Sequence, residues 1–104
     1  SRKMLREFWE THADARKVLE AWYLDTKRAD WKTPSDIKQV YRNASFIANN
    51  RVVFNIKGNR YRVIVVVLYE KGVVYLRFVG HTASMTRLML RLFNGVPYYG
   101  YSTD

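Results

Sequence analysis

The chain has 104 residues, 48% of them hydrophobic, which is enough for one domain with one core and too few for two. It contains no cysteine, which excludes a disulfide scaffold and thiolate zinc sites and fits a cytoplasmic protein. No apolar run approaches the roughly 18 residues that a membrane helix needs, so no membrane partner is expected. The formal net charge of +9 favours a polyanionic partner, most often nucleic acid.

The first third of the chain predicts two short amphipathic helices. Apolar residues recur at helical spacing through residues 2–10 and again through residues 13–27, with a break near His12. Ser1 can cap the first of these helices. Two such helices would cover one face of a flat partner.

A third, shorter helix is expected after a loop. Pro34 interrupts the pattern, and Ser35 or Asp36 can cap a helix that continues to Tyr41. Trp31, in the loop before it, is expected to anchor that loop to the core.

From residue 45 onward the apolar period changes from helical to two, which is typical of strands. Turns are expected at residues 57–59 and 71–72, where Gly58 or Asn59 can take a positive φ. The three long strands that result would cover residues 51–56, 60–70 and 73–79. The fold class is therefore α+β: a three- to four-stranded antiparallel sheet with two N-terminal helices on one face.

The chain changes character after Gly80. Residues 81–93 can form an amphipathic helix, whereas residues 94–104 show no regular period. No internal repeat is present.

Charge is distributed unevenly along the chain, because no Asp or Glu occurs between Ile37 and Tyr69. Basic residues do occur in this stretch and on the strand that follows it. The strands or their turn would bring four of them together, Lys57, Arg60, Arg62 and Arg77, with His81 just beyond the last strand. Cleavage of RNA needs fixed cations around the phosphate and a group that transfers protons. By themselves these residues favour a docking surface over a catalytic one.

Other kinds of site find no support in the sequence. The two histidines, His12 and His81, lie far apart and have no carboxylate neighbours at ligand spacing, so no metal site is expected. No phosphate-binding glycine pattern occurs. Tyr61 and Tyr75 could stack on RNA bases, but their alternation suits packing equally well.

One run stands out in the middle of the chain, Arg51-Val52-Val53-Phe54-Asn55-Ile56-Lys57-Gly58-Asn59-Arg60-Tyr61-Arg62. It is accompanied by Leu5-Arg6-Glu7-Phe8-Trp9, by Ala29-Asp30-Trp31-Lys32-Thr33-Pro34 and by Val74-Tyr75-Leu76-Arg77-Phe78-Val79-Gly80. Together these stretches closely resemble the HigB family of RelE-like toxins, from Ser1 to about Gly80.

The resemblance implies a RelE-like fold and cleavage of mRNA on translating ribosomes, without a metal or other cofactor. It also implies a HigA antitoxin as partner, and contact with operator DNA only through the antitoxin complex. Carried over by position, Lys57, Arg60, Arg62 and Arg77 would face the phosphate, with His81 beside them. Three further residues are expected to contact RNA: Arg51, Asn59 and Tyr61.

The chain departs from the family after Gly80. Members continue with a pattern of the type Thr-His-x-Glu-Tyr-Asp and end soon afterwards, whereas this chain reads His81-Thr82-Ala83-Ser84 and runs on. We therefore expect a single domain over residues 1–104, of which residues 1–80 are family-like and residues 81–104 form an atypical tail. A shift of one residue in strand register would also turn His81 to the wrong face of the sheet.

We hypothesise that a frameshift explains this departure. Codons for residues 81–94 can be chosen so that the string, read from its third base, encodes His-Ser-Glu-Tyr-Asp, seven more residues and a stop. The tail is then the product of a shifted reading frame. Because the family's terminal acid and base groups would be missing, we expect hydrolysis by this chain to be impaired.

Two alternatives from other functional classes remain open. The chain could be a non-catalytic basic module that binds RNA or the ribosome, in which case it would bind without cutting. It could also be a regulator that acts at an operator only together with HigA.

Overall fold

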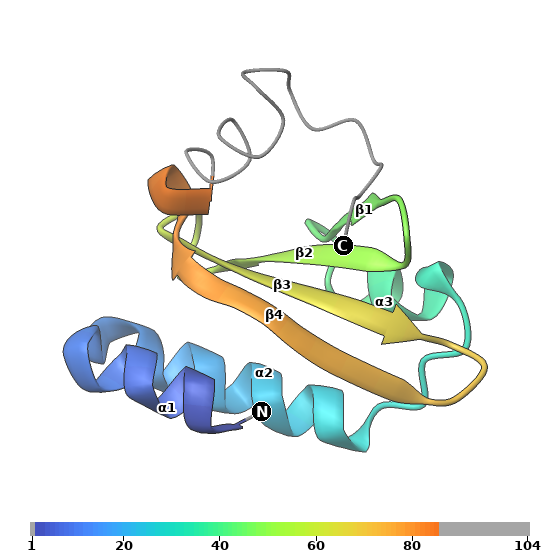
Figure 1. Cartoon of the computed structure of the whole chain (residues 1–104), viewed down its shortest axis with the longest axis horizontal. Helices are drawn as coiled ribbons and strands as arrows, with labels where there is room; N and C mark the ends of the chain where they lie inside the picture. The colour runs from blue at the N-terminus through green and yellow to red at the C-terminus, as the bar shows by residue number, and fades with distance from the viewer. Residues whose placement is uncertain (1, 86–104) are drawn as a thin grey trace.

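In the computed structural model, which describes residues 2–85, two helices lie side by side beneath one face of an antiparallel sheet (Figure 1). Helix α1 spans Arg2–Thr11 and α2 spans Arg16–Arg28, and a short 3-10 turn, η1, covers Ala13–Ala15 between them. The two predicted N-terminal helices are confirmed, although residues 13–15 form a tighter turn and delay the start of α2. The cap predicted at Ser1 lies outside the described residues.

The apolar stripes of α1 and α2 explain why both helices pack on the sheet. Leu5 and Trp9 lie four residues apart on α1, and Leu19 and Trp22 lie three apart on α2; all four are buried. Side chains at these spacings share one helix face. The Leu19 side chain is fully buried, so its truncation to alanine would cost about 2–5 kcal/mol of stability.

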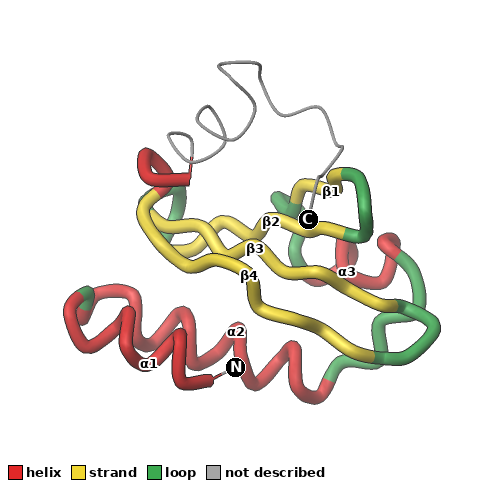
Figure 2. Tube along the Cα trace, viewed as in Figure 1, coloured by secondary structure: helices red, strands yellow, loops and turns green. Residues whose placement is uncertain are grey.

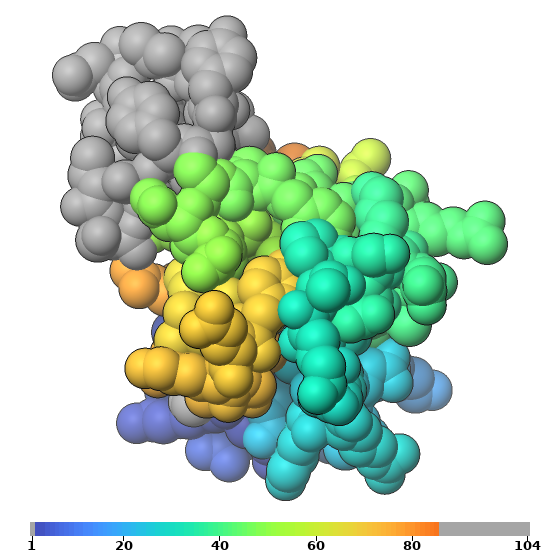
Figure 3. All heavy atoms as spheres, turned by 90° about the vertical axis from the view of Figure 1, so that its right-hand side faces the viewer, coloured from blue at the N-terminus to red at the C-terminus, as the bar shows by residue number. Residues whose placement is uncertain are grey.

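Helix α3 spans Pro34–Val40 and begins with a capping box. The Asp36 amide donates to Thr33 Oγ1 at 3.4 Å, and the Thr33 amide donates to Asp36 Oδ2 at 3.1 Å. The prediction that Ser35 or Asp36 is the cap is therefore wrong. Pro34 begins the helix instead of preceding it, because the first helical position needs no amide donor and favours the φ that proline fixes. In Figure 3, the segment around α3 (teal) lies beside the β3–β4 turn (yellow-orange).

The sheet consists of four antiparallel strands in sequence order (Figure 2). They are β1 (Ser45–Ile47), β2 (Arg51–Ile56), β3 (Tyr61–Leu68) and β4 (Val73–His81). The three long strands are confirmed, and the short β1 adds a fourth at the edge beside β2. The expected α+β class is confirmed.

Alternation of side chains divides the sheet into two faces, as the sequence period predicted. The face of the sheet that the two helices cover forms the main core. Trp31 packs into this core as predicted, with its ring stacked on that of Phe54 at 6.0 Å between centroids. The sheet contributes Val52, Phe54, Ile56, Tyr61, Val63, Val65 and Val67. We call the opposite side the open face; on it, Val53 and Ile64 pack with Met85.

Strand β4 contains an irregularity in its pairing with β3. Ile64 pairs with Phe78, but the next residue, Val65, pairs with Leu76, so Arg77 is an extra residue on β4. This is the pattern of a β-bulge. Val79 and Leu76 both lie against the core, although they are separated by an odd number of positions, because the bulge absorbs one residue.

The turn between β2 and β3 takes left-handed backbone angles, with φ of 54° at Lys57 and 65° at Gly58. The expectation of a positive φ is confirmed at Gly58, and its neighbour in this conformation is Lys57, not Asn59. After β4, residues 82–85 form a helical turn. The rest of the helix predicted for residues 81–93 lies outside the described residues, and His81 itself belongs to β4.

Candidate functional site

A group of polar and aromatic side chains gathers where the turn after α1 meets the start of β3 and the end of β4. We call it the corner cluster, and its members are His12, Asp14, Arg60, Tyr61 and His81. Strand register accounts for part of it, because Tyr61 pairs directly with His81 across β3 and β4. The rings of these two residues lie 5.1 Å apart between centroids.

The two histidines of the corner cluster are in direct contact. His12 Nε2 lies 3.0 Å from His81 Nε2, although the residues are 69 positions apart in the sequence. His12 Nδ1 lies 3.0 Å from the Phe8 carbonyl oxygen, and the His12 ring stacks on the Phe8 ring at 4.0 Å between centroids. His12 Nδ1 also lies 3.0 Å from the Thr11 hydroxyl oxygen. In the tautomer with the proton on Nδ1, this atom donates to the Phe8 carbonyl oxygen, and Nε2 offers a lone pair to a proton on His81 Nε2.

Asp14 joins the other two members of the corner cluster. Its carboxylate accepts a hydrogen bond of 2.6 Å from the Tyr61 hydroxyl and forms a 2.7 Å ion pair with the Arg60 guanidinium. The hydrogen bond from Tyr61, with a smaller contribution from Arg60, lowers the pKa of Asp14 below its ordinary value. The same hydrogen bond raises the pKa of Tyr61, so the phenol keeps its proton at neutral pH.

The predicted cation Arg62 lies on the open face, opposite His81. It pairs across the sheet with Asn55 and Gly80, next to the Tyr61–His81 pair, whose side chains lie on the other face. Its Nη2 donates to Asn59 Oδ1 at 3.3 Å, while its Nε is buried without a hydrogen-bond partner. A guanidinium that is partly desolvated and fixed by one neighbour is suited to an anionic oxygen.

The structure brings three of the predicted site residues together and spreads the others. Arg60, Tyr61 and His81 meet in the corner cluster, and Lys57 is exposed in the adjacent turn. Tyr61 is only 3% exposed, so the face of its ring is not open for stacking. Its polar contact is made through the hydroxyl group. The remaining predicted residues lie outside the cluster: Arg62 and Asn59 beside the open face, Arg77 at the bulge, and Arg51 at the far end of β2.

Sequence reasoning missed His12 and Asp14. Both lie in the connection between the two helices, where the helical pattern breaks, and that break was the only local signal. Their partners are 69 and 47 residues away. His12 and His81 were not expected to form a pair because they lie far apart in the sequence. That separation does not predict their distance in the folded chain.

A basic pocket of about 500 Å³ lies between α3, the loop after it and the β2–β3 turn. Its polar lining is cationic or neutral, since Lys38 and Arg42 are accompanied only by Ser45 and asparagines, Asn43, Asn55 and Asn59. Asn59 also accepts a hydrogen bond from Arg62, which connects the pocket lining to a cation of the open face. Amide and cationic groups of this kind can hold a base edge and its phosphate.

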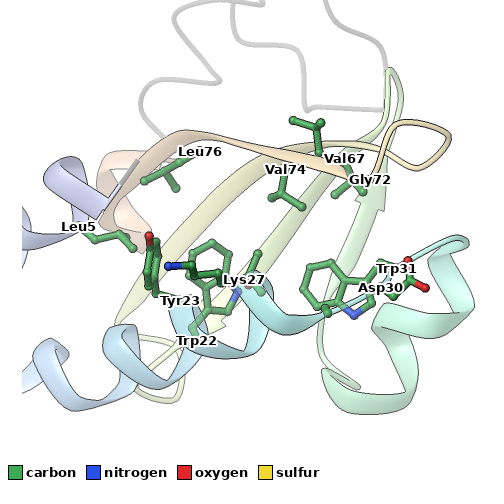
Figure 4. Close-up of a pocket in the computed structure, with 13 residues that line it drawn as sticks. Leu5, Trp22, Tyr23, Lys27, Asp30, Trp31, Val67, Gly72, Val74 and Leu76 are labelled. Carbon is green, nitrogen blue, oxygen red and sulfur yellow. The ribbon is translucent and has the colours of Figure 1, made fainter.

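A second cavity, of about 370 Å³, separates α2 from β3 and β4 (Figure 4). Its lining combines apolar side chains such as Trp22, Trp31 and Leu76 with the polar side chains of Thr26, Lys27 and Asp30. The Trp22 Nε1 and Thr26 Oγ1 atoms are buried there without hydrogen-bond partners. The cavity lies between α2 and the sheet, and its lining includes none of the predicted site cations Lys57, Arg60, Arg62 and Arg77.

Within residues 2–85, no three His, Cys, Asp or Glu side chains gather closely enough to form a metal centre of three or more ligands. No helix among these residues combines the length and apolar character needed to cross a bilayer.

A helix-covered antiparallel meander of this size, with cations on and beside its open face, defines a small basic α+β domain of the RelE-like kind. The chain belongs to the HigB toxin family, described as the RelE-like toxic component of a toxin–antitoxin system, and the family model matches residues 15–84. It is therefore a toxin by family, and such a toxin has an antitoxin as its partner. A search of curated proteins finds no match to the chain.

Proposed function

We propose that the chain descends from a ribosome-dependent endoribonuclease that cleaves translated mRNA in the cytoplasm, without a metal cofactor, and is neutralised by a HigA antitoxin. The observation that carries the proposal is the family match over residues 15–84, more than half of the chain. Contact with operator DNA would occur only through the antitoxin complex.

The charge of the open side of the sheet supports RNA as the ligand. Arg62 presents a partly buried guanidinium there, and the basic pocket beside Asn59 has no carboxylate in its lining. In this proposal Lys57, Arg62 and Arg77 face the phosphates. Such fixed cations stabilise the charge that develops on the phosphorane, which is usually the largest contribution to rate.

The corner cluster offers groups for proton transfer. A histidine pair that shares one proton can accept a proton at one Nε2 and donate one from the other, and each such role is worth on the order of 10²–10⁴-fold. Arg60 is already paired with Asp14, so a phosphate would have to compete with that carboxylate. Tyr61 keeps its proton, and its role is to hold Asp14 in place.

We further propose that this particular chain is attenuated. His81 and Arg62 lie on opposite faces of the sheet, which separates a proton-transfer group from a phosphate-binding group. The family match ends at residue 84, close to the point after Gly80 where the sequence departs from the family pattern. Residues 1–104 would then be one domain whose last part is not of the family type.

Induced expression tests the proposal. Two versions should be compared: the chain as given, and one in which the residues after Gly80 are replaced by a family-type Thr-His-x-Glu-Tyr-Asp ending. The second should arrest growth, with mRNA cut in the ribosomal A site, and co-expressed HigA should restore growth. The first should bind ribosomes with weak cleavage or none. Absence of cleavage by both versions would contradict the proposal.

A non-catalytic RNA- or ribosome-binding module is the second candidate. The separation of His81 from Arg62 across the sheet favours it for the chain as given, because cations suffice for docking. Ribosome binding without cleavage in both versions would identify this function.

A further inference from the structure

We propose that His12 and His81 form a binding site for a late first-row divalent metal ion such as Cu²⁺, Ni²⁺ or Zn²⁺. The juxtaposition that carries the proposal is the 3.0 Å distance between their Nε2 atoms. The site is independent of the proposed nuclease activity, since it needs only the two imidazoles.

The orientation of His12 suits a metal ligand. Its Nδ1 is bound to the Phe8 carbonyl oxygen at 3.0 Å, and its ring is stacked on Phe8. Histidines that bind metals usually donate their second ring nitrogen to a carbonyl or carboxylate, which fixes both tautomer and ring direction. In the tautomer with the proton on Nδ1, His12 presents a fixed Nε2 lone pair without any movement of the ring.

The distance between the two nitrogens suits shared coordination. Two nitrogens each about 2.0–2.1 Å from a metal lie about 3 Å apart at a ligand angle near 90° and about 3.3 Å apart at the tetrahedral angle. The observed 3.0 Å fits the right-angled arrangement that Cu²⁺ and Ni²⁺ prefer. A separation greater by a few tenths of an ångström would fit Zn²⁺.

The angle between the rings is also suitable. Their centroids are 4.8 Å apart and their planes meet at 72°, so the rings approach obliquely and not end to end. A shift of the His81 proton from Nε2 to Nδ1 would leave an Nε2 lone pair on each ring, and the two can converge on a point beside the contact. The metal would then lie between the two Nε2 atoms, and each imidazole would stay neutral with its proton on Nδ1.

The surroundings of the two histidines leave room for a metal ion and for the water molecules that would complete its coordination. His81 is exposed and His12 is half-buried. Asp14 is occupied by Tyr61 and Arg60, so its carboxylate is not expected to join the metal. Two protein ligands, with water in the other positions, should give a dissociation constant in the micromolar range, well short of that of a four-ligand structural site.

A bound metal would have two consequences. It would link the turn after α1 to the end of β4, two points 69 residues apart. It would also occupy both nitrogen lone pairs that proton transfer would use, so it would inhibit any cleavage that depends on these histidines.

Isothermal titration calorimetry of the untagged full-length chain with CuCl₂, NiCl₂ and ZnCl₂ tests the site. One ion should bind per chain, with affinity in the order Cu²⁺ > Ni²⁺. His12→Gln and His81→Gln should each weaken binding at least ten-fold. Glu10→Gln, an exposed carboxylate beside the turn, is the matched control and should leave binding unchanged.

A second measurement needs no variant. The chain has two histidines, so their imidazole NMR signals are easily distinguished, and substoichiometric Ni²⁺ should shift or broaden both before other signals change. No binding at millimolar metal, or binding that survives both substitutions in folded protein, would overturn the proposal. Broadening of one histidine alone would also overturn it.

Discussion

The Tyr61 hydroxyl donates a 2.6 Å hydrogen bond to Asp14 Oδ1, which fastens the turn between the two N-terminal helices to the first residue of β3. The residues are 47 positions apart. The contact holds the turn that carries His12 against the strand that pairs with His81. The geometry of the histidine pair thus depends on this hydrogen bond.

The pH dependence of stability should reveal that contact. Because the hydrogen bond from Tyr61 lowers the pKa of Asp14, the folded state binds fewer protons than the unfolded state near the ordinary aspartate value of about 3.9. The stabilisation is present above that value and is lost as the pH falls through the lower pKa of the folded state. Urea unfolding should show wild type more stable than Asp14→Asn at pH 7, with the difference shrinking toward pH 3.

Asp30→Asn provides the matched control for this series. The Asp30 side chain is 81% exposed and lies 3.8 Å from Lys32, so its substitution should change stability little at any pH. A difference between wild type and Asp14→Asn that stays constant from pH 7 to pH 3 would contradict the assignment.

Arg62→Ala should weaken binding of short single-stranded RNA by about 10–100-fold, the value of a hydrogen bond to a charged group. The slope of log affinity against log salt concentration should become less steep by about one unit, because one phosphate contact is lost. Fluorescence anisotropy at several salt concentrations measures both quantities. Lys17→Ala, an exposed cation on α2, is the control; an equal loss in both variants would show that only net charge matters.

Thr33→Ala should destabilise the protein by about 1 kcal/mol, because it removes the side-chain acceptor that caps α3. Thr33→Ser keeps the hydroxyl and should be close to wild type. Thermal or urea unfolding of the three proteins checks this. Equal stability of the alanine and serine variants would show that the capping box contributes nothing.

Gly58→Ala should cost about 1 kcal/mol or slightly more, because Gly58 has a φ of 65° that side chains with a Cβ disfavour. No atom lies within 4 Å of the position a Cβ would take, so the loss would come from the backbone alone. Gly58→Asn should lose less, since asparagine tolerates this conformation. Urea unfolding should rank the proteins as wild type, asparagine, alanine.

The nucleotide sequence of the gene tests the hypothesis that a frameshift produced the residues after Gly80. Around the Gly80 codon, the nucleotide sequence should encode Glu-Tyr-Asp and then a stop in another frame. Sequencing both strands of the gene measures this directly. A sequence without that motif in either alternative frame would end the frameshift hypothesis.

Local patterns predicted most of the fold. The alternation of Val52, Phe54 and Ile56 indicated which face of β2 is buried, because neighbouring residues determine that period. The cap of α3 was placed too late, since proline was treated as a break and not as a first helical residue. For the site, Arg60, Tyr61 and His81 could be nominated, but His12 and Asp14 could not. Their contacts depend on how the helix pair docks on the sheet, which no short stretch of sequence records.

The bulge in β4 has a consequence for changes in chain length. Regular alternation back from Val79 and His81 would put Leu76 on the open face, and the extra position at Arg77 keeps Leu76 against the core. If residue 77 were removed, Leu76 and Val79 would be two positions apart, as residues on one face of a regular strand are. Each remaining residue of β4 would then keep its side of the sheet. Removal of Phe78 would instead put Arg77 in its place on the open face. Strand β4 therefore has one position at which the gene could lose a whole codon and still encode the same buried surface.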